Sequence, residues 1–293
     1  MRQLRLDSFE HLIRDERRAY RILKARRIGG KPRHLQCVGC GRDRLYFLAE
    51  GRYRCKSCGH TFGPFTRTWL GQSRLALRRW LWLVKLFELE VTAHVAAQQT
   101  EVSYPTALRT FTLMRRALLA EQAPELWPLI ASEVEADESY FGGRRRGKRA
   151  GGRVGRAALG KIPVFGILER RGQVHVTVVP NVQAATLVGE TIKLVKRGSL
   201  VYTDKYPGYD ALTFCGYRHL KVDHGRRFSQ GRVHINGLEG FWSYAKGKLQ
   251  KHHGISPKYF PLYLYEMQFR YNHRQDNLFE LLLQLLLKPV PTA

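Results

Sequence analysis

Two cysteine pairs constrain the fold of this chain more than any other feature of its sequence. Cys37-Val-Gly-Cys40 and Cys55-Lys-Ser-Cys58 are separated by fourteen residues. Each Cys-x-x-Cys pair can form a knuckle whose two thiolates converge on one ion, and two knuckles joined by a hairpin give a tetrahedral zinc site. Residues 45–48 and 52–54 supply the hairpin. The sequence therefore predicts a zinc ribbon over residues 31–66, with structural Zn²⁺ held by Cys37, Cys40, Cys55 and Cys58.

The cysteine pairs leave the role of the ribbon open. Four thiolates complete a tetrahedral shell, so the site is expected to be structural and not catalytic. Paired cysteines suit metal binding in a reducing compartment, and a redox dithiol is the alternative that two pairs at this spacing disfavour. DNA contact, protein contact and stability alone all remain open as roles.

The charge of the chain indicates its partner. Lysine and arginine number 50 against 24 acidic residues, which gives a formal net charge of +26. Such an excess favours a polyanion, and double-stranded DNA is the expected partner, with a ribosome-associated basic protein as the alternative. No run of about 18 apolar residues occurs, so we expect no membrane span and a cytoplasmic, nucleoid-associated protein.

Helical patterns flank the ribbon. Apolar residues at helical spacing predict one basic amphipathic helix over residues 1–30. Residues 67–122 are also helical in pattern, and Ser103 is the expected N-cap of the last helix. A short helix, a tight turn and a second helix suit a helix-turn-helix, and a plain helical hairpin is the alternative. The side chains that such a motif would offer to a DNA groove are Tyr104, Thr106, Arg109 and Thr110.

Strands and helices alternate after residue 122. Three strands in succession, then helix, strand, helix, strand and helix, predict a mixed α/β layer. The expected strands are 130–140, 163–169, 173–179, one around Val201, and 219–222; the expected helices are 184–196, 210–214 and 235–249. We assign this layer to a catalytic domain over residues 123–293, which includes amphipathic helices predicted between residues 256 and 287.

A basic arm loosened by glycine separates the first two predicted strands. It is too polar to pack, so we expect it to order only when it meets phosphates, and a solvated loop is the alternative. Its candidate DNA contacts are Arg144, Arg145, Arg146, Lys148, Arg149, Arg153 and Arg156.

Three acidic residues fall at the ends of predicted elements. Asp137 lies in the first strand, and Asp204 directly follows a later one. Asn236 is a candidate helix N-cap, which places Glu239 in the first helical turn and Lys246 on the same face seven residues on. Carboxylates on two strands and a helix can hold two Mg²⁺ or Mn²⁺ ions for phosphoryl transfer, and Lys246 would hold a DNA phosphate.

Each carboxylate also has a purely structural interpretation. Asp204 could cap the turn that follows it, and Glu239 could be a helix-start residue favoured by the helix dipole. Asp137 has acidic neighbours, of which Glu135 shares its strand face while Glu138 points away. The combination with the charge excess and the order of elements favours a catalytic set.

Several strings of this sequence occur together in one order: the four cysteines, Val102-Ser-Tyr-Pro-Thr-Ala, Asp137-Glu-Ser-Tyr-Phe-Gly-Gly, Thr203-Asp-Lys-Tyr-Pro-Gly-Tyr and Asn236-Gly-Leu-Glu-Gly-Phe-Trp-Ser. In these strings the chain resembles the zinc-ribbon insertion-sequence transposases of the ISXO-like kind, relatives of the Merlin elements. The resemblance implies a ribonuclease H-like catalytic domain with a DDE motif, in which Asp137, Asp204 and Glu239 bind metal. It also implies metal-dependent cleavage and strand transfer at inverted terminal repeats.

The sequence therefore predicts a DNA transposase that works as a dimer or larger assembly, since two DNA ends must be held together. A structure-specific nuclease of the same fold is one alternative, and a zinc-ribbon and helix-turn-helix transcription regulator without catalysis is another. Phe241, Trp242 and Tyr244 are candidates to stack on an unpaired base, with a core aromatic cluster as the alternative for at least two of them.

Overall fold

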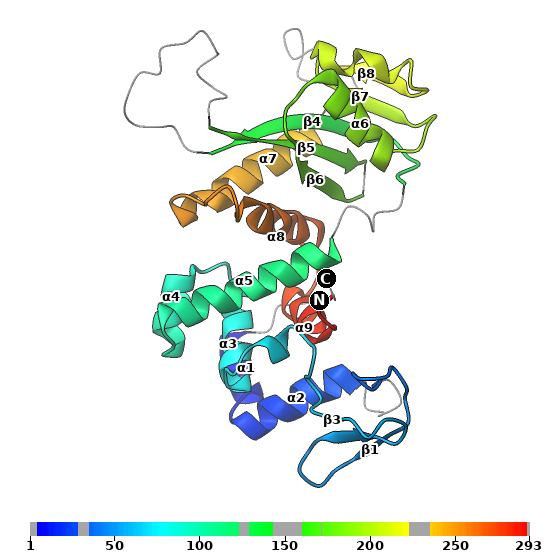
Figure 1. Ribbon diagram of the computed structural model, residues 1–293. Helices are drawn as coiled ribbons and strands as arrows, with labels where there is room; N and C mark the ends of the chain where they lie inside the picture. The colour runs from blue at the N-terminus through cyan, green and yellow to red at the C-terminus, as the bar shows by residue number, and fades with distance from the viewer. Residues whose placement is uncertain are drawn as a thin grey trace. The chain divides into compact units, whose positions relative to one another are not determined.

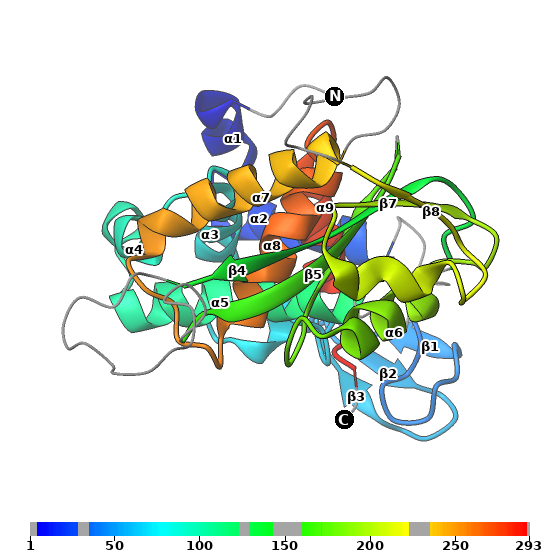
Figure 2. The ribbon, with the colours of Figure 1, turned by 90° about the horizontal axis from the view of Figure 1, so that it is seen from above.

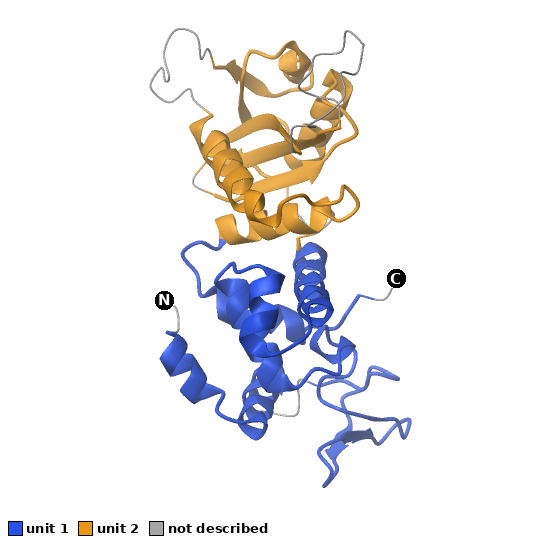
Figure 3. Cartoon of the chain, turned by 90° about the vertical axis from the view of Figure 1, so that its left-hand side faces the viewer, with its two compact units in different colours: residues 1–121, 273–293 blue, residues 122–272 orange. Residues whose placement is uncertain are grey.

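The computed structural model describes residues 5–28, 35–122, 129–142, 160–170, 172–222 and 235–291. The chain forms two compact units (Figure 3). The first unit joins Met1–Glu121 with His273–Ala293, and the second is Gln122–Asn272. Within the described residues no helix is long and apolar enough to span a membrane.

The first unit begins with two helices where the sequence predicted one. Helix α1 is Leu6–Leu12 and α2 is Glu16–Ile28. The break follows from the side chain of Asp15, whose Oδ1 accepts the backbone N–H of Arg18 at 2.7 Å, the geometry of a helix N-cap. Phe9 and Ile13 are buried before the break and Ala19 and Leu23 are buried after it, so packing also fixes the bend.

The zinc ribbon has the predicted hairpin and one further strand. Strands β1 (Leu45–Phe47), β2 (Tyr53–Cys55) and β3 (Thr61–Phe62) form an antiparallel sheet in that order. Gly51 takes a φ of +89° in the β1–β2 turn, a conformation that glycine adopts without steric cost.

Four further helices complete the first unit. They are α3 (Leu77–Glu88), α4 (Ala93–Thr100), α5 (Tyr104–Glu121) and α9 (Leu278–Leu287). Helix α5 starts directly after Ser103, as predicted. Helix α9 was expected with the catalytic domain, and that assignment is wrong. Its leucine-rich face packs on α2, α3 and α5, so residues 273–293 belong to the first unit.

The second unit is built on a five-stranded mixed sheet (Figure 1). Its strands are β4 (Val134–Phe141), β5 (Ile162–Glu169), β6 (Val174–Val178), β7 (Leu200–Thr203) and β8 (Arg218–Lys221), in the order β6-β5-β4-β7-β8. The β4–β5 and β5–β6 pairs are antiparallel, whereas β4–β7 and β7–β8 are parallel. Three antiparallel strands followed by two parallel ones form the ribonuclease H-like mixed sheet, which confirms the predicted fold class.

Helices cover both faces of this sheet (Figure 2). Helix α6 (Ala184–Leu194) and the 3₁₀ helix η4 (Pro207–Leu212) pack with Val134 and Ala136 of β4 on one face. Helices α7 (Asn236–Leu249) and α8 (Phe260–Asn272) pack with Phe141 on the other. The 3₁₀ helix η4 lies where a short helix was expected at 210–214, but it begins three residues earlier, at Pro207.

Candidate functional site

The four predicted zinc ligands converge in the ribbon. Their ligand atoms all lie within 4.8 Å of one another. The sulfurs of Cys37 and Cys58 are 3.5 Å apart, and those of Cys40 and Cys55 are 3.6 Å apart. Backbone N–H groups point at the sulfurs of both knuckles, from Gly39 to Cys37 and from Ser57 to Cys55, each at 3.3 Å. Four sulfurs in this arrangement match the tetrahedral coordination of Zn²⁺.

The electrostatics of the ribbon favour a thiolate at Cys55 but not at Cys58. The backbone N–H of His60 lowers the pKa of Cys58, but hydrogen bonds with the sulfurs of Cys40 and Cys37 raise it to about 12. Burial raises the pKa of the Cys55 thiol, but the backbone N–H groups of Cys58 and Ser57 outweigh it and lower that pKa to about 6. The thiolate is the form that binds metal. The backbone of the knuckle therefore prepares the site for the ion.

Asp137 lies on the α7 face of the second unit's sheet. Alternation along β4 places it with Glu135 and Phe141 on that face, as the sequence predicted for Glu135. Its Oδ2 accepts a hydrogen bond from the indole Nε1 of Trp242 on α7 at 2.9 Å. Gly166 on β5 makes room for this indole, since a Cβ there would lie 2.7 Å from Trp242 Cζ2. The carboxylate is thus fixed between strand and helix.

Asp204 follows β7, the parallel neighbour of β4. The register pairs Glu135 with Tyr202, and two further residues along both strands bring Asp137 and Asp204 to the same level of the sheet. Asp204 Oδ1 accepts the N–H of Tyr206 at 2.9 Å. The turn-capping interpretation of Asp204 is therefore correct, and this hydrogen bond uses one of its two carboxylate oxygens.

The carboxyl groups influence one another. Burial raises the pKa of Asp137, and the charges of Glu138 and then Asp204 raise it further, to about 7, against the lowering effect of the Trp242 hydrogen bond. Glu138 was expected to point away, and it does face η4, where the hydroxyl of Tyr209 donates to its Oε2 at 2.6 Å. Its charge still acts on Asp137, which strand alternation alone could not show.

Helix α7 starts differently from the prediction. Asn236 is its first residue and Ile235 occupies the N-cap position, with no hydrogen bond from its side chain. The buried carboxylate of Glu135 takes over this role, because its Oε2 accepts the N–H of Leu238 at 3.0 Å. A Cβ on Gly237 would lie 2.9 Å from that same oxygen. Glycine at this position lets the sheet carboxylate cap the helix directly.

Helix α7 carries the last two predicted catalytic residues. Glu239 is exposed in the first turn, three residues before Trp242. Lys246 lies one turn beyond Trp242, with its Nζ 5.6 Å from the centre of the Phe141 ring. Burial lowers the pKa of Lys246, whereas the charge of Asp137 raises it. Asp204 and Lys246 thus both lie close enough to Asp137 for their charges to interact with its carboxyl group.

The acidic residues do not close into one ligand set. Across the described ranges, the four cysteines are the only group of three or more potential ligands whose atoms all lie within 4.8 Å. Asp137, Asp204 and Glu239 therefore do not form such a group.

The predicted DNA contacts of the helix-turn-helix are only partly accessible. Tyr104 and Arg109 are exposed, and Thr106 is half-buried. Thr110 is 2% exposed and donates to the carbonyl of Thr106, so its prediction as a groove contact is wrong. The seven residues predicted in the basic arm, Arg144, Arg145, Arg146, Lys148, Arg149, Arg153 and Arg156, lie outside the described residues.

Two family models match this chain, one over the zinc ribbon and one over the unit with the five-stranded sheet. The family model of the transposase zinc-ribbon domain matches residues 14–61, and that of the ISXO2-like transposase domain matches residues 130–272. An uncharacterized transposase-like protein of Haemophilus influenzae is 41% identical over 103 residues, which cover 35% of this chain and 84% of the relative. An uncharacterized protein in transposable element ISH50 of Halobacterium salinarum is 33% identical over 236 residues, which cover 75% of this chain and 78% of the relative.

Solved structures give a weaker match. The Mos1 transposase paired-end complex with the left transposon end is 14% identical, with a TM-score of 0.26, over 65% of this chain and 76% of that chain. The Mos1 strand transfer complex matches with the same TM-score and identity over 65% and 75%. Likeness at this level carries no argument for site or function. The sequence matches to both domains and to the two relatives show that this chain belongs to the ISXO2-like transposase family.

Proposed function

We propose that this chain binds the inverted terminal repeats of an insertion sequence and catalyses DNA cleavage and strand transfer with two divalent metal ions. The observation that carries the proposal is the placement of Asp137 and Asp204 at the same level of neighbouring parallel strands, close enough for one charge to raise the pKa of the other carboxyl. Family membership and the net charge of +26 support it.

The donor set fits hard divalent cations. The three residues offer carboxylate oxygens, which suit Mg²⁺ or Mn²⁺. Burial and the charges of Glu138 and Asp204 raise the pKa of Asp137, and a bound cation would favour its charged form. Asp137, Asp204 and Glu239 would hold the ions, and Glu239, on the first turn of α7, has room to approach because it is exposed.

When bound, the two ions would activate the attacking hydroxyl and stabilise the leaving oxygen. The surrounding residues have positioning roles. Trp242 orients the carboxylate of Asp137 through its indole N–H, and Glu135 holds the start of the helix that carries Glu239. Lys246 would bind a phosphate of the DNA, since its ammonium lies beside the carboxylates at the surface of the sheet.

The remaining parts would recognise DNA. The ribbon (31–66) and the helix-turn-helix (67–122) would contact the element ends, the latter through Tyr104, Thr106 and Arg109, and the basic arm would contact phosphates. We propose a homo-oligomer on paired ends, in the nucleoid, because cleavage and joining require two ends at one place. The residues from 123 to 272 form the catalytic domain in this proposal.

The test uses a duplex of the DNA that flanks this reading frame, incubated with purified protein and Mg²⁺ or Mn²⁺. We expect 3′-end cleavage and joining to a second duplex. Asp204→Asn should abolish both, whereas Asp210→Asn, an exposed aspartate of the same unit paired with Lys221, should retain them.

Other results would change the assignment. Cleavage without joining would indicate a nuclease of the same fold. Tight binding with neither reaction in either metal, with zinc retained, would indicate a DNA-binding regulator.

A further inference from the structure

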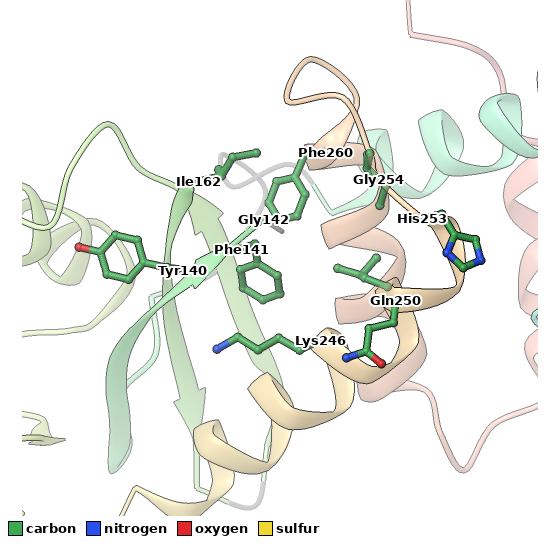
Figure 4. A pocket seen from close by; sticks show the side chains of 11 residues that line it. Tyr140, Phe141, Gly142, Ile162, Lys246, Gln250, His253, Gly254 and Phe260 are labelled. Carbon is green, nitrogen blue, oxygen red and sulfur yellow. The ribbon is translucent and has the colours of Figure 1, made fainter. Parts of the chain in front are cut away.

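A cavity of about 540 Å³ opens on the α7 face of the second unit, next to Lys246 (Figure 4). It lies between the end of the β4–β5 pair, helix α7 with the following 3₁₀ helix η5 (Gln250–His252), and the start of α8. Its volume falls within the range of about 300–1,000 Å³ typical of sites for small organic groups. None of its lining residues except Lys246 has a place in the proposed chemistry.

The walls of the cavity are mainly apolar, and Gln250 and His253 add polar groups on the helix side. Figure 4 shows Phe141, Ile162 and Phe260 grouped at the strand ends and α8, opposite Gln250 and His253. Flat aromatic groups with a polar edge suit such a site, because apolar walls contact the ring faces while an amide and an imidazole can pair with the edge. A nucleobase has this character.

The mouth of the cavity is cationic. Lys246 lines it, and Lys161 is close enough for its charge to lower the pKa of Lys246. Two neighbouring ammonium groups favour an anionic attachment on the occupant, such as the phosphate of a nucleotide. An apolar peptide segment would leave these charges unmatched.

The cavity lies close enough to Asp137 for one bound DNA strand to reach both. Phe141 and Asp137 lie on the same face of β4, four residues apart, which is about 13 Å along a strand. DNA that passed over the carboxylates would therefore place a nucleotide a few steps from the reacting phosphate at the mouth. Two of the three aromatic residues predicted for stacking do not compete for this role, since Phe241 and Trp242 are buried. Tyr244 is half-buried and packs against the same core.

We infer that this cavity receives one unstacked nucleobase of DNA bound across Asp137 and Asp204, while Lys246 holds the phosphate attached to it. The inference rests on the proposed function, and it adds a binding site for a base next to the metal site. It requires single-stranded or frayed DNA at this position, because a paired base cannot leave the stack without a cost in free energy.

The test compares two forked duplexes that differ only in their short single-stranded arm. One arm is thymidine, and the other is a sugar–phosphate chain of the same charge without bases. Binding is measured with the full chain, with zinc bound and no Mg²⁺ or Mn²⁺ added, so cleavage is not needed. We expect the thymidine arm to bind at least about fivefold more tightly, the scale of stacking one base.

The position of the base is read from isotope-labelled isoleucine methyl groups. Ile162 and Ile255 line the cavity and should shift with the thymidine arm only, whereas Ile167 on the opposite face of the sheet should not. Leu249→Trp, which fills the cavity, should remove the preference for thymidine and keep duplex binding. Ile192→Trp, on the exposed side of α6, should leave the preference intact.

Equal affinity for both arms, or equal methyl shifts with both, would overturn the base site. A failure of the proposed function would give a different result: the protein would not join DNA but would still prefer the thymidine arm. Joining that persists with no preference would leave the transposase proposal standing and refute the cavity's role.

Discussion

The zinc ribbon and the acidic site are both assigned to metal, yet the chain builds them differently. The ribbon takes its ligands from two short knuckles, and their sulfurs already lie within 4.8 Å of one another. The acidic site would take Asp137 from the middle of β4, Asp204 from the end of β7 and Glu239 from a helix, and these do not converge. Thiols can approach one another as neutral groups, whereas carboxylates repel, so only a rigid scaffold can hold them near one place.

The two sites therefore differ in which contacts hold their ligands in place. Backbone N–H groups within each knuckle prepare the cysteines. Contacts from other elements prepare the carboxylates, since Trp242 holds Asp137 and Glu135 holds α7. The ribbon should therefore fail when its ion is lost, and the acidic site should fail when its scaffold moves.

Loss of a cysteine should give the largest effect. Cys55→Ser removes one of four ligands, and zinc binding supplies about 10–16 kcal/mol to the folding of small zinc modules. We expect loss of zinc, measured by metal analysis, and rapid proteolysis between residues 35 and 62. The thermal transition of the second unit should remain.

Cys215→Ser provides the control for this variant. Cys215 is half-buried beside η4 in the second unit and is remote in sequence from the knuckles. It should retain one zinc ion. If Cys55→Ser also retained zinc and protease resistance, the ribbon would not depend on its ion, and the contrast between the two sites would be lost.

Neutralising Asp137 should stabilise the protein when no Mg²⁺ or Mn²⁺ is present. Folding raises the pKa of this carboxyl from 3.8 to about 7, so the folded state binds more protons than the unfolded state between these values. Stability from this group therefore falls as the pH rises from about 4 to 7, by up to about 4 kcal/mol. Asp137→Asn removes this loss and should unfold at higher denaturant concentration than wild type at pH 8.

Added Mg²⁺ sharpens the same experiment. It should raise the stability of the wild-type protein at pH 8 and leave Asp137→Asn almost unchanged, because the variant lacks a ligand. Asp210→Asn should behave as wild type in both conditions. If the stability of the wild-type protein did not change between pH 5 and pH 8, folding would not raise the pKa of Asp137.

Displacing the start of α7 should have an intermediate effect on stability. In Gly237→Ala the new Cβ would meet Glu135 Oε2, at 2.9 Å, and the side chain of Leu168. Because the hydrogen bond to Leu238 fixes Glu135, we expect a loss of about 1–3 kcal/mol of stability in urea denaturation, as for other overpacked sites. Joining should slow as well, since the first turn of α7 carries Glu239.

Gly240→Ala is the matched control, one turn along the same helix. A Cβ there meets nothing within 4 Å, so the helix propensity of alanine should add about 0.5–1 kcal/mol. If both variants were equally stable, the contact between Glu135 and the start of α7 would not position the helix.

The sequence predicted those parts of both sites that depend on local spacing. The cysteine knuckles, the β1–β2 hairpin and the start of α5 after Ser103 each follow from residues a few positions apart. The mixed sheet followed from the order of strands and helices. Alternation along β4 correctly placed Glu135 on the face of Asp137.

The features that sequence reasoning missed depend on tertiary contacts. Asn236 has the right chemistry for an N-cap, but a carboxylate from the sheet caps the helix instead. Thr110 has a side chain suited to DNA contact, but packing buries it. Helix α9 is distant in the chain from the first unit that it joins, so no local pattern could assign it there.

The smallest expected effect concerns Glu138, the acidic residue whose influence strand alternation did not reveal. Its charge raises the pKa of Asp137, so Glu138→Gln should lower that pKa, by about one unit or less. The carboxyl of Asp137 would then ionise at lower pH, and the pH-dependent loss of stability in metal-free protein would begin at lower pH. Glu133→Gln is the control, because Glu133 directly precedes β4 but accepts from the hydroxyl of Tyr202 at 3.1 Å and does not contribute to the shift. Carboxyl-carbon NMR of Asp137 measures the change directly. Identical titration in both variants would mean that the charge of Glu138 does not act on Asp137, and that burial, the Trp242 hydrogen bond and Asp204 set the pKa of Asp137 without it.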